Sequence, residues 1–495
     1  MKILLVYPQY PDTFWGFKHA LKFVSKKASV PPLGLLTVAS MLPKEWDKKL
    51  VDMNVVSLTD DQIKWADYVF ISAMAVQEKS VREVIARCKQ LGAKTAAGGP
   101  LFTSSREDFD AVNHLVLNEA EVTLPLFLAD LEKCSAKHVY TSEERPDITK
   151  SNTPMWSLID MKKYFSMNIQ YSRGCPFNCE FCDIIALNGN VPRTKSKHQV
   201  LTELEALYQQ GWRKSVFIVD DNFIGNKRKL KEEILPAIIK WMEEKKYPFT
   251  FHTEASINLA DDEELMQMMV TAGFDKVFVG IETPNEESLV ECSKSQNTKR
   301  DLVSSVKKIQ NHGIEVMGGF IVGFDSDPLS IFKNQINFIQ KSGIVTAMVG
   351  LLNAPPGTRL YRRLNSENRL LTGFVGNNTD GSMNFIPKMD HDVLIKGHKE
   401  IVTTIYGYKN YYERIKAFLK EYQPSYPVFK RIQFQDIVSL LKSIWVLGIR
   451  EKGKRQYWSL FFETLFKHPR KMPISISLVI YGYHFRKITE IYVAG

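Results

Sequence analysis

The chain has 495 residues, of which 44% are hydrophobic and 24% charged, and its formal net charge is +10. This is enough chain for roughly two to four domains, and the composition excludes disordered, collagen-like and fibrous proteins. The six cysteines are too few and too unevenly spaced for a secreted disulfide framework. No signal-peptide core follows Met1, and the longest nearly apolar stretch, residues 473–485, is shorter than the ~20 residues of a membrane span. We therefore expect a cytoplasmic protein.

The first part of the chain alternates short apolar runs with helical periods. Helical spacing occurs at residues 31–42 and 80–92. Five nearly continuous apolar runs, which indicate strands buried on both faces, lie at residues 2–6, 49–53, 67–74, 94–99 and 114–119. This alternation predicts an α/β, doubly wound (Rossmann-like) domain over residues 1–135, with its ligand outside the carboxyl ends of the strands.

After a polar linker, residues 136–164, a second alternating series begins. Its strand-like runs lie at residues 167–172, 216–222, 249–256, 276–282, 315–324 and 346–352. Six βα units predict a partial (β/α)6 barrel over residues 165–395. The chemistry of parallel barrels gathers at the carboxyl ends of the strands, and polar residues stand at those ends here.

Beyond residue 395 the alternation stops. Residues 401–422 and 436–466 show amphipathic helical spacing with many aromatic and basic side chains. We expect a mainly helical, basic domain over residues 396–495. Residues 411–495 hold fifteen basic and six acidic residues, so nearly all of the net positive charge lies there.

The strongest signal for chemistry is the sequence YSRGCPFNCEFCD, which follows the first strand of the second series. Its cysteines, Cys175, Cys179 and Cys182, form a CxxxCxxC motif. Three thiolates on one short loop can bind three corners of a 4Fe-4S cluster and leave the fourth iron open to a substrate. The alternatives are a zinc site or three unrelated cysteines. Zinc sites close with four ligands, and the nearest histidine, His198, lies sixteen residues beyond Cys182.

This motif resembles the hallmark of radical SAM enzymes, CxxxCxΦC, with Phe181 at the aromatic position. The resemblance covers residues 165 to about 360. It implies that the open iron chelates the amino and carboxylate groups of S-adenosylmethionine. One-electron cleavage of that cofactor then yields a 5′-deoxyadenosyl radical, which takes a hydrogen atom from an unactivated carbon.

The same resemblance implies which residues contact S-adenosylmethionine. Asp220, Asp221 and Asn222 occupy the place of a Gly-Gly-Glu-like element that receives the methionyl amino group, and the glycines are lost here. The resemblance also implies that Glu254, Ser256 and Glu282 contact the carboxylate and ribose of this cofactor, and that Gly318, Gly319 and Gly323 lie against its adenine. For each acid the alternative is an ordinary strand-end or helix-capping carboxylate.

The first 135 residues look like the cobalamin-binding domain of cobalamin-dependent radical SAM enzymes. The stretches that carry this resemblance are 31–35, 71–74 with Ser72, Gly98-Gly99-Pro100, and 118–121 with Glu119. Small residues after strands let a corrin ring lie against the backbone. A doubly wound domain with another ligand, or with none, remains the alternative, because open sheets accept many ligands.

The DxHxxG motif, which supplies a histidine to cobalt in many cobalamin proteins, is absent. Before residue 135 only His19 and His114 occur, and neither has that setting. If cobalamin binds, we expect cobalt without a histidine from this domain. Met74 or Gln77, after the third strand, could approach the lower face of the cofactor. The alternative, and the commoner arrangement, is a packed methionine and an exposed glutamine.

Nearly the whole chain resembles the subgroup of these enzymes with a shared carboxy-terminal extension, which includes hopanoid carbon-2 methyltransferases and tetraether-lipid ring-forming enzymes. The passages that carry the resemblance are 219–227, 253–262, 277–285 and 318–325. It implies a cobalamin-dependent radical SAM methyltransferase that acts on an unactivated carbon of a hydrophobic, lipid-like or isoprenoid-like substrate. Its cofactors are a 4Fe-4S cluster, S-adenosylmethionine and cobalamin, and a one-electron donor such as flavodoxin or ferredoxin serves it.

Two other functions stay open. One keeps both cofactors but forms a carbon–carbon bond, or rearranges the substrate, without net methylation. The other is modification of nucleic acid, suggested by the basic carboxy-terminal region. Methylthiotransferases of that kind carry a second cysteine triad in the first domain, where only Cys88 and Cys134 occur. We therefore expect no nucleic-acid partner.

The carboxy-terminal region also raises the question of membrane contact. Arg450, Lys452, Lys454 and Arg455 alternate with candidate apolar anchors at Trp445, Tyr457, Trp458, Phe461, Phe462 and Phe466. Such a mixture is typical of a helix that lies on an anionic membrane surface. The alternative is that these aromatic side chains pack against the barrel and the cations form a solvated face.

Overall fold

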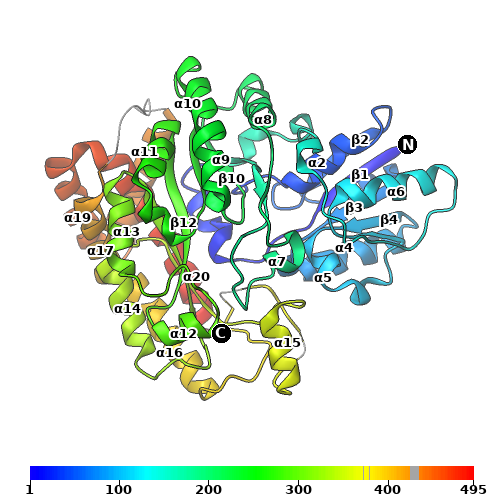
Figure 1. The fold of residues 1–495 in the computed structure, drawn as a ribbon. Coiled ribbons are helices and arrows are strands. Elements are labelled where there is room, and N and C mark those ends of the chain that lie inside the picture. The colour runs from blue at the N-terminus through cyan, green and yellow to red at the C-terminus, as the bar shows by residue number, and fades with distance from the viewer. Residues whose placement is uncertain (372, 378–379, 424–433, 495) are drawn as a thin grey trace.

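The computed structural model describes residues 1–371, 373–377, 380–423 and 434–494. The chain forms two parallel β-sheets that lie side by side and a stack of carboxy-terminal helices on the far side of the second sheet (Figure 1). This confirms the predicted α/β architecture of a doubly wound domain, a partial barrel and a mainly helical carboxy-terminal part. In the described part of the chain, no helix combines the length and the apolar character needed to cross a membrane.

The first sheet is fully parallel, in the order β2-β1-β3-β4-β5-β6. Its strands are β1 Lys2–Tyr7, β2 Asp47–Asp52, β3 Tyr68–Ser72, β4 Lys94–Gly98, β5 His114–Val116 and β6 Val139–Tyr140. Five of them match the predicted runs. The sixth lies in the segment for which the sequence predicts only a linker, because two residues are too short for a recognisable apolar pattern.

Helices cover both faces of this sheet, as the continuous apolar strands predict. They are α2 Leu33–Met41, α3 Asp60–Trp65, α4 Glu78–Gln90, α5 Pro100–Ser104 and α6 Ala120–Glu132. The short helix α1 Lys18–Leu21 lies elsewhere, since its Ala20 is buried in the core of the barrel. Alternate residues of β1 belong to two separate cores: Leu4 and Val6 pack on one face, and Ile3 and Leu5 pack on the other. In sheets of this kind, ligands bind outside the carboxyl ends of the strands.

The second sheet is also parallel, in the order β14-β13-β12-β11-β10-β7, and it forms the predicted six-stranded partial barrel. Its strands are β7 Met167–Ile169, β10 Ser215–Ile218, β11 Thr250–Glu254, β12 Phe274–Glu282, β13 Glu315–Val322 and β14 Ala347–Leu351. The helices between and after them are α7 Ile184–Asn188, α8 Lys197–Gln209, α9 Lys227–Lys229, α10 Leu235–Glu244, α11 Glu263–Ala272, α12 Glu286–Glu291, α13 Leu302–Asn311, α14 Ile331–Ser342 and α15 Arg359–Ser366.

A two-stranded antiparallel hairpin that the sequence analysis missed interrupts this series after β7. Its strands, β8 Ser172–Arg173 and β9 Arg193–Thr194, enclose the cysteine motif and α7. Arg173 pairs with Arg193 across the hairpin. Two-residue strands of polar residues carry no period-2 signal, and only the tertiary fold reveals them.

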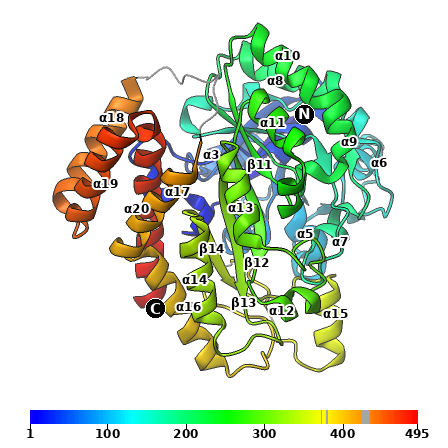
Figure 2. The ribbon, with the colours of Figure 1, turned by 60° about the vertical axis from the view of Figure 1, so that its left-hand side comes forward.

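The carboxy-terminal helices share one continuous core with the barrel. They are α16 His391–Tyr406, α17 Tyr408–Glu421, α18 Phe434–Ser443, the π-helix η10 Ile444–Arg450, α19 Lys454–Lys467 and α20 Met472–Ala494. In Figure 2, α16, α17 and α20 lie next to the barrel, and α18 and α19 are outermost. The predicted helical runs are broken at Gly407 and between Arg450 and Lys454, where the chain turns.

The segment between β1 and α2 leaves the first domain and joins this core. Phe14, in the short 3-10 helix η1 Phe14–Gly16, stacks on Phe485 of α20 with ring centroids 4.1 Å apart. The ring of His484, the residue before Phe485, hydrogen-bonds through Nε2 to the backbone oxygen of Phe14, at 2.8 Å. Burial lowers the pKa of His484 from 6.5 to about 4.

This histidine predicts acid sensitivity of the fold. Between about pH 6.5 and 4 the His484 side chain takes up a proton in the unfolded chain but not in the folded one, so stability falls as pH falls. The full effect is roughly 3 kcal/mol, from a pKa difference of about two and a half units. Urea midpoints at about pH 7 and about pH 5 measure it. We expect His484→Gln to flatten the dependence and the exposed His391→Gln to leave it unchanged. An equal loss of stability between pH 7 and pH 5 in the unaltered protein and in both variants would contradict this assignment.

Candidate functional site

The cysteine loop, residues 175–182, lies at the carboxyl end of the barrel sheet and is fixed by contacts from several elements. The amide of Cys175 donates to the oxygen of Gly189 at 3.3 Å. The amide of Glu180 donates to the oxygen of Cys292 at 2.9 Å, and the Glu180 carboxylate accepts two hydrogen bonds from Arg363 of α15, at 2.8 and 3.0 Å. The loop is therefore anchored independently of any ligand.

A side-chain amide lies near two of the three cysteine sulfurs. The side-chain amide of Asn222 lies 3.9 Å from Cys175 Sγ, and that of Gln296 lies 3.8 Å from Cys179 Sγ. Burial raises the pKa of the thiols of Cys175 and Cys182. A bound metal reverses that preference, because thiolates, not thiols, bind metals. N–H donors to sulfur and partial burial are features that tune iron–sulfur clusters, so the donor set fits one.

A single metal ion fits the triad less well. Among the residues that the structure describes, no three His, Cys, Asp or Glu side chains converge on a point that could hold one ion. A cubane distributes three cysteines over three different irons, so their sulfurs need not converge in this way. A zinc ion requires convergence of its ligands. The geometry therefore favours the cluster over the zinc alternative.

The aspartates after β10 both bind groups of the chain itself. Asp220 is buried and accepts hydrogen bonds from the Tyr171 amide at 2.8 Å and from Ser172 Oγ at 2.6 Å. Its burial raises the pKa to about 7. Asp221 accepts from the Gly174 amide at 3.0 Å, directly before the first cysteine. Both carboxylates thus orient the strand and the turn that lead into the cysteine loop.

The polar residues predicted at the ends of the next strands differ in whether they have a hydrogen-bond partner. Asn222 and Ser256 hydrogen-bond to each other, at 3.2 Å. Glu254 of β11 is different, because no hydrogen-bond donor from the described residues contacts its carboxylate. Burial, and then the nearby Asp221 and Asp220, raise the pKa of Glu254 to about 8. An incoming ammonium group, such as the amino group of S-adenosylmethionine, would lower this pKa again and supply the donor that Glu254 lacks.

Glu282 and Lys294 form a buried ion pair, with Nζ and Oε1 2.6 Å apart. The Lys294 ammonium also lies 6.0 Å from the centre of the Phe181 ring, within the cysteine loop. A side chain at Gly280 would overlap the Glu282 carboxylate and the Lys294 ammonium, so a larger residue there would displace this pair. Lys294 was missed by sequence reasoning, since an isolated lysine after a helix carries no motif.

The predicted adenine element is partly filled by the chain itself. A Cβ at Gly319 would lie 2.7 Å from the ring of Phe278, and one at Gly318 would lie 2.7 Å from Phe320. Gly323 has φ +107° and donates its amide to Asp327 at 2.8 Å. Gly318 and Gly319 therefore permit internal packing here, while Gly323 forms the turn at the strand end.

Cys292 is a packed thiol, 2% exposed, whose Sγ contacts the backbone oxygen of Leu289.

In the first domain, several predicted residues meet at the carboxyl edge of the sheet. Gly99 has φ +94°, and a Cβ there would lie 2.6 Å from Ser72 Oγ. A Cβ at Gly98 would overlap the backbone oxygen of Val116, and Pro100 begins α5. Adjacent strand ends therefore approach one another closely and present backbone, as binding of a large planar cofactor requires.

Met74 and Gln77, by contrast, have the reverse of the expected burial. Gln77 is 1% exposed, and its side chain accepts from the Met74 amide at 2.9 Å and donates to the oxygen of Pro8. Met74 is 50% exposed. The expectation of a packed methionine and an exposed glutamine is wrong, because the amide is used to close the turn after β3. Met74 is therefore exposed at the carboxyl edge of the first sheet. Neither His114, at the opposite, amino end of β5, nor His19, packed near His484 of α20, lies at this edge.

Glu119 lies at the same edge but is committed to ion pairs. It precedes α6 and contacts Arg173 at 2.7 Å and Arg193 at 2.7 Å, both on the β8–β9 hairpin. These pairs join the first domain to the barrel. Sequence reasoning placed Glu119 near the cofactor but missed both arginines, because their partner is more than fifty residues away.

Residues 169–339 match the radical SAM superfamily, and residues 358–495 match a domain of unknown function (DUF4070). An uncharacterized methyltransferase of Synechocystis sp. is 42% identical over 99% of this chain and 92% of its own length. The hopanoid C-2 methylase of Rhodopseudomonas palustris is 33% identical over 94% of this chain and 90% of its own length.

Solved structures support the same fold. The cobalamin-dependent S-adenosylmethionine radical enzyme OxsB has a TM-score of 0.63 and 16% identity, with coverage of 100% of this chain and 80% of that one. The radical S-adenosylmethionine methyltransferase TsrM of Kitasatospora setae has a TM-score of 0.62 and 13% identity, with 99% of both chains covered.

Proposed function

Because this chain belongs to the radical SAM superfamily, we propose that it is a cobalamin-dependent radical SAM methyltransferase that methylates an unactivated carbon of a hydrophobic, isoprenoid-like substrate. When bound, the cluster with S-adenosylmethionine supplies hydrogen-atom abstraction, and cobalamin supplies the methyl group. The relatives named as methyltransferases and as a hopanoid methylase support the reaction class. A small one-electron donor, such as flavodoxin or ferredoxin, would provide the reducing equivalents.

The chain's own residues would hold these groups as follows. Cys175, Cys179 and Cys182 ligate three irons, and Asp221 orients the turn before the first of them. The carboxylate of Glu254, which no donor from the described residues contacts, would receive the amino group of S-adenosylmethionine. This assignment replaces the expected one to Asp220 and Asp221, whose carboxylates already accept hydrogen bonds from the chain. The Ser72, Gly98 and Gly99 edge of the first domain accepts the corrin ring.

The inner face of the barrel sheet carries the argument for a hydrophobic substrate. Side chains alternate between the two faces of a strand, so Phe278, Met317 and Met348 point inward. They are only partly buried, whereas their neighbours under the outer helices are fully buried. Below this apolar layer, toward the amino ends of the strands, Lys276 and Glu315 form an ion pair at 3.3 Å. The apolar layer thus lies between this ion pair and the polar rim that carries the cysteine loop.

Trp15, from the first domain, completes this apolar layer. Its indole Nε1 lies 2.9 Å from Met348 Sδ, and its ring meets Phe278 edge to face with centroids 5.3 Å apart. We expect Trp15→Ala to raise KM for a hydrophobic substrate by roughly tenfold, since a large apolar contact area is lost. The charge-transfer absorbance of the iron–sulfur cluster should stay unchanged. The matched control is Trp65→Ala, whose ring packs under Lys49 instead, at 4.0 Å. An unchanged KM for Trp15→Ala would contradict the assignment of this layer to substrate.

The test of the reaction itself is anaerobic reconstitution with iron, sulfide and cobalamin, followed by incubation with isoprenoid lipid extract and methyl-labelled S-adenosylmethionine. A labelled lipid product heavier by one methyl group supports the proposal. An unlabelled product with a new carbon–carbon bond would instead favour the bond-forming alternative. Modification of nucleic acid has less support, because the first domain has only Cys88, buried in α4, and Cys134, exposed after α6, and not a second cysteine triad.

We also propose that the protein takes its substrate at an anionic membrane surface, which it contacts through α18, η10 and α19. Ile437, Leu441, Trp445 and Ile449 recur every four residues along one helical face and are 47% to 60% exposed. Phe462, Leu465 and Phe466 form a second exposed apolar set on α19, with Phe466 78% exposed.

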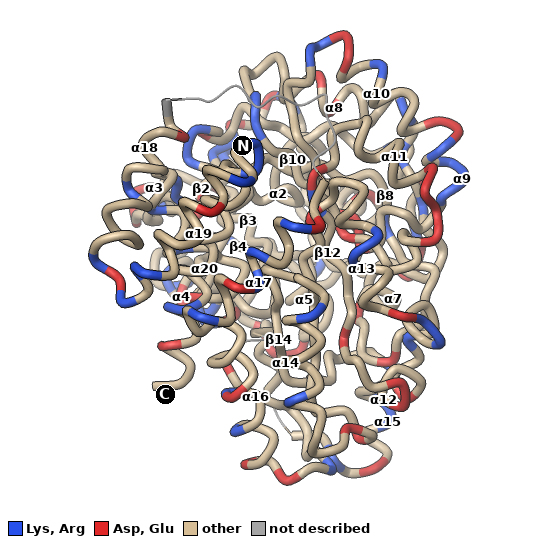
Figure 3. The backbone as a smooth tube through the Cα atoms, turned by 90° about the vertical axis from the view of Figure 1, so that its left-hand side faces the viewer, with Lys and Arg blue, Asp and Glu red and all other residues tan. Residues whose placement is uncertain are grey.

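Charge supports the same partner. Residues 434–471 hold eight basic and three acidic residues, and Arg450, Lys452, Lys454 and Arg455 are exposed on the turn between the two apolar sets. Figure 3 shows this side of the molecule with its Lys and Arg positions in blue. One of the candidate anchors packs inside the protein instead of facing solvent: Tyr457 is 1% exposed and hydrogen-bonds to Ser443 at 2.9 Å.

Vesicle sedimentation tests this contact. We expect binding to anionic vesicles at low salt, release at high salt, and little binding to neutral vesicles, with each basic residue near the surface worth about 1 kcal/mol. Phe466→Ser should weaken binding. Leu329→Ser, which removes an equally exposed apolar side chain (71%) from another part of the molecule, should not. Equal recovery of the protein in the supernatant with both vesicle types would contradict the membrane proposal.

A further inference from the structure

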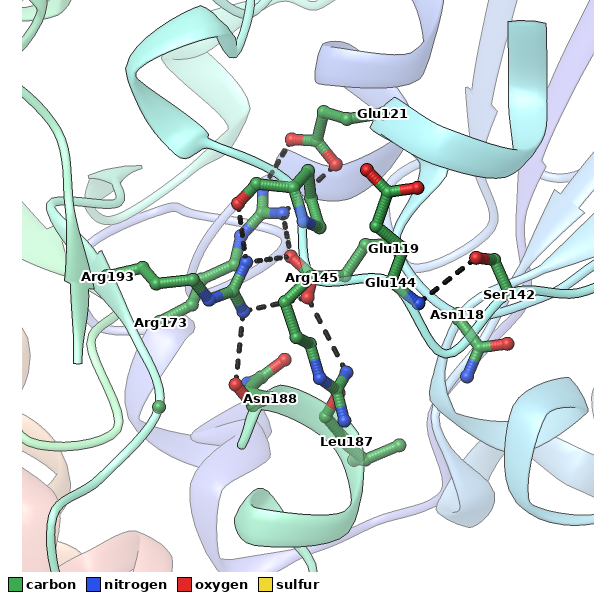
Figure 4. Close-up of polar contacts among 12 residues, drawn as sticks. Asn118, Glu119, Glu121, Ser142, Glu144, Arg145, Arg173, Leu187, Asn188 and Arg193 are labelled. Carbon is green, nitrogen blue, oxygen red and sulfur yellow. Dashed lines mark hydrogen bonds and ion pairs between the residues drawn. The ribbon is translucent and has the colours of Figure 1, made fainter. Parts of the chain in front are cut away.

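An ion-pair cluster joins the first domain to the hairpin that encloses the cysteine loop (Figure 4). Arg173 Nη1 lies 2.7 Å from Glu119 Oε2, and Arg173 Nη2 lies 2.7 Å from Glu121 Oε1. Arg193 contacts both oxygens of Glu119, at 2.7 and 3.0 Å. We call this set the interdomain ion-pair cluster, and its members are Glu119, Glu121, Arg145, Arg173 and Arg193.

The cluster is largely shielded from water. The side chains of Glu119, Glu121, Arg173 and Arg193 are 7%, 13%, 14% and 17% exposed. Burial acts to raise the pKa of Glu121, but hydrogen bonds from Arg173 outweigh it and lower that pKa to about 2. The net stabilisation from a buried ion pair is small, bidentate arginine geometry adds geometric specificity, and removal of one partner leaves a buried charge without compensation.

On the barrel side, the cluster continues into the turn before the cysteine loop. Arg193 Nη2 donates to the oxygen of Asn188 at 3.0 Å, and the Asn188 side chain donates to Asp221 at 3.1 Å. Asp221 also accepts from the Gly174 amide at 3.0 Å. Arg145 donates to the oxygens of Ala186, at 2.9 Å, and Leu187, at the carboxyl end of α7. Each of these contacts has at least one partner on the segment from β8 to β9.

On the side of the first domain, the cluster lies beside the edge proposed for cobalamin. Glu119 follows β5 by three residues and directly precedes α6, and its side chain makes no capping hydrogen bond to that helix. Val116, the last residue of β5, approaches Gly98 so closely that no side chain fits there. The contacts therefore run without a gap from the strand ends of the first domain to the cysteine loop of the barrel.

We propose that the interdomain ion-pair cluster positions the two cofactor sites relative to each other, and thereby sets the distance between cobalt and the iron–sulfur cluster. This inference rests on the proposed function, since it requires both groups to bind. Its members are positioning residues, because none of them needs to contact substrate. A methyl group can reach the activated carbon only if both sites face the same substrate atom within bonding range, and flexible tethering would not ensure this.

The test measures the distance directly in the reconstituted full-length protein. Cob(II)alamin and the reduced cluster are both paramagnetic, so pulsed electron paramagnetic resonance reports their separation without any substrate. We expect a narrow distance distribution for the unaltered protein. Glu121→Gln and Arg173→Gln should each broaden and shift it while bound iron and bound cobalamin stay at their original amounts. Glu205→Gln breaks a pair with Lys245 within the barrel, at 3.0 Å, and should leave the distribution unchanged.

The outcomes separate the two proposals. An unchanged distribution in both Glu121→Gln and Arg173→Gln would overturn the positioning role and leave the proposed function intact. Failure of the unaltered protein to bind cobalamin would overturn both. Should the charge-removing variants fail to fold, Arg173→Lys keeps the charge but loses the fork of donors. That variant should still broaden the distribution, and an unaltered distance in it would also overturn the proposal.

Discussion

Replacement of Cys179 by alanine is expected to abolish the iron–sulfur cluster and all cleavage of S-adenosylmethionine. Cys179 is 7% exposed and lies between the other two cysteines on a loop whose backbone is anchored at Cys175 and Glu180. Two thiolates cannot hold a cubane that keeps one iron open, so the loss should be complete rather than partial. The measurements are the charge-transfer absorbance of the anaerobic protein and the release of 5′-deoxyadenosine.

The matched control is Cys134→Ala, which removes an exposed cysteine from the first domain and should retain both signals. Zinc binding in place of the cluster would leave the unaltered protein without charge-transfer absorbance. Full cleavage activity in Cys179→Ala would contradict the radical SAM assignment of this loop.

The second large effect concerns cobalamin. We expect the purified protein to bind it at the edge formed by Ser72, Gly98 and Gly99, and Gly99→Val to abolish this binding. Gly99 has φ +94°, and an added Cβ would meet Ser72 Oγ at 2.6 Å, so valine both strains the backbone and closes the gap. Absorbance of bound cobalamin after gel filtration measures the loss.

The cobalt environment provides a separate readout for the unaltered protein. His114 hydrogen-bonds to the backbone oxygen of Lys137 at the amino end of β5, and His19 packs near His484, so neither reaches the edge. The electron paramagnetic resonance spectrum of the cob(II)alamin form should therefore show no hyperfine coupling to a protein nitrogen. A clear histidine coupling would refute this placement of the cofactor.

The sequence predicts the architecture well because long apolar runs are strong signals. All five predicted strands of the first sheet and all six of the barrel are present, although most end a few residues earlier than expected. The polar residues at the carboxyl ends of strands belong to turns or face ligands. They therefore carry no hydrophobic periodicity that could mark where the strand ends. The strands that were missed, β6, β8 and β9, have two residues each. Their pairing is decided by the tertiary fold and not by local composition.

The site was predicted less completely, for a different physical reason. The cysteine motif is local in sequence, whereas its environment is assembled from distant segments. Lys294 is oriented by Glu282, and Arg173 is oriented by Glu119, fifty-four positions earlier. The burial of Met74 and Gln77 is the reverse of the prediction because Gln77 donates a hydrogen bond to the backbone oxygen of Pro8, which follows another strand. This bond holds the glutamine side chain in the interior. Partners of this kind leave no trace in a single sequence.

The insertion of Trp15 into the barrel has a consequence for engineering and for evolution. Trp15 belongs to the segment between β1 and α2, yet its ring contacts Phe278 and Met348 of the barrel. An exchange of the first domain between related enzymes would thus replace one wall of the proposed substrate site together with the cofactor edge. Chimeras that join a foreign first domain to this barrel should inherit part of the donor's substrate preference. Selectivity would then follow the inserted segment as well as the barrel, and the two domains should diverge as a unit.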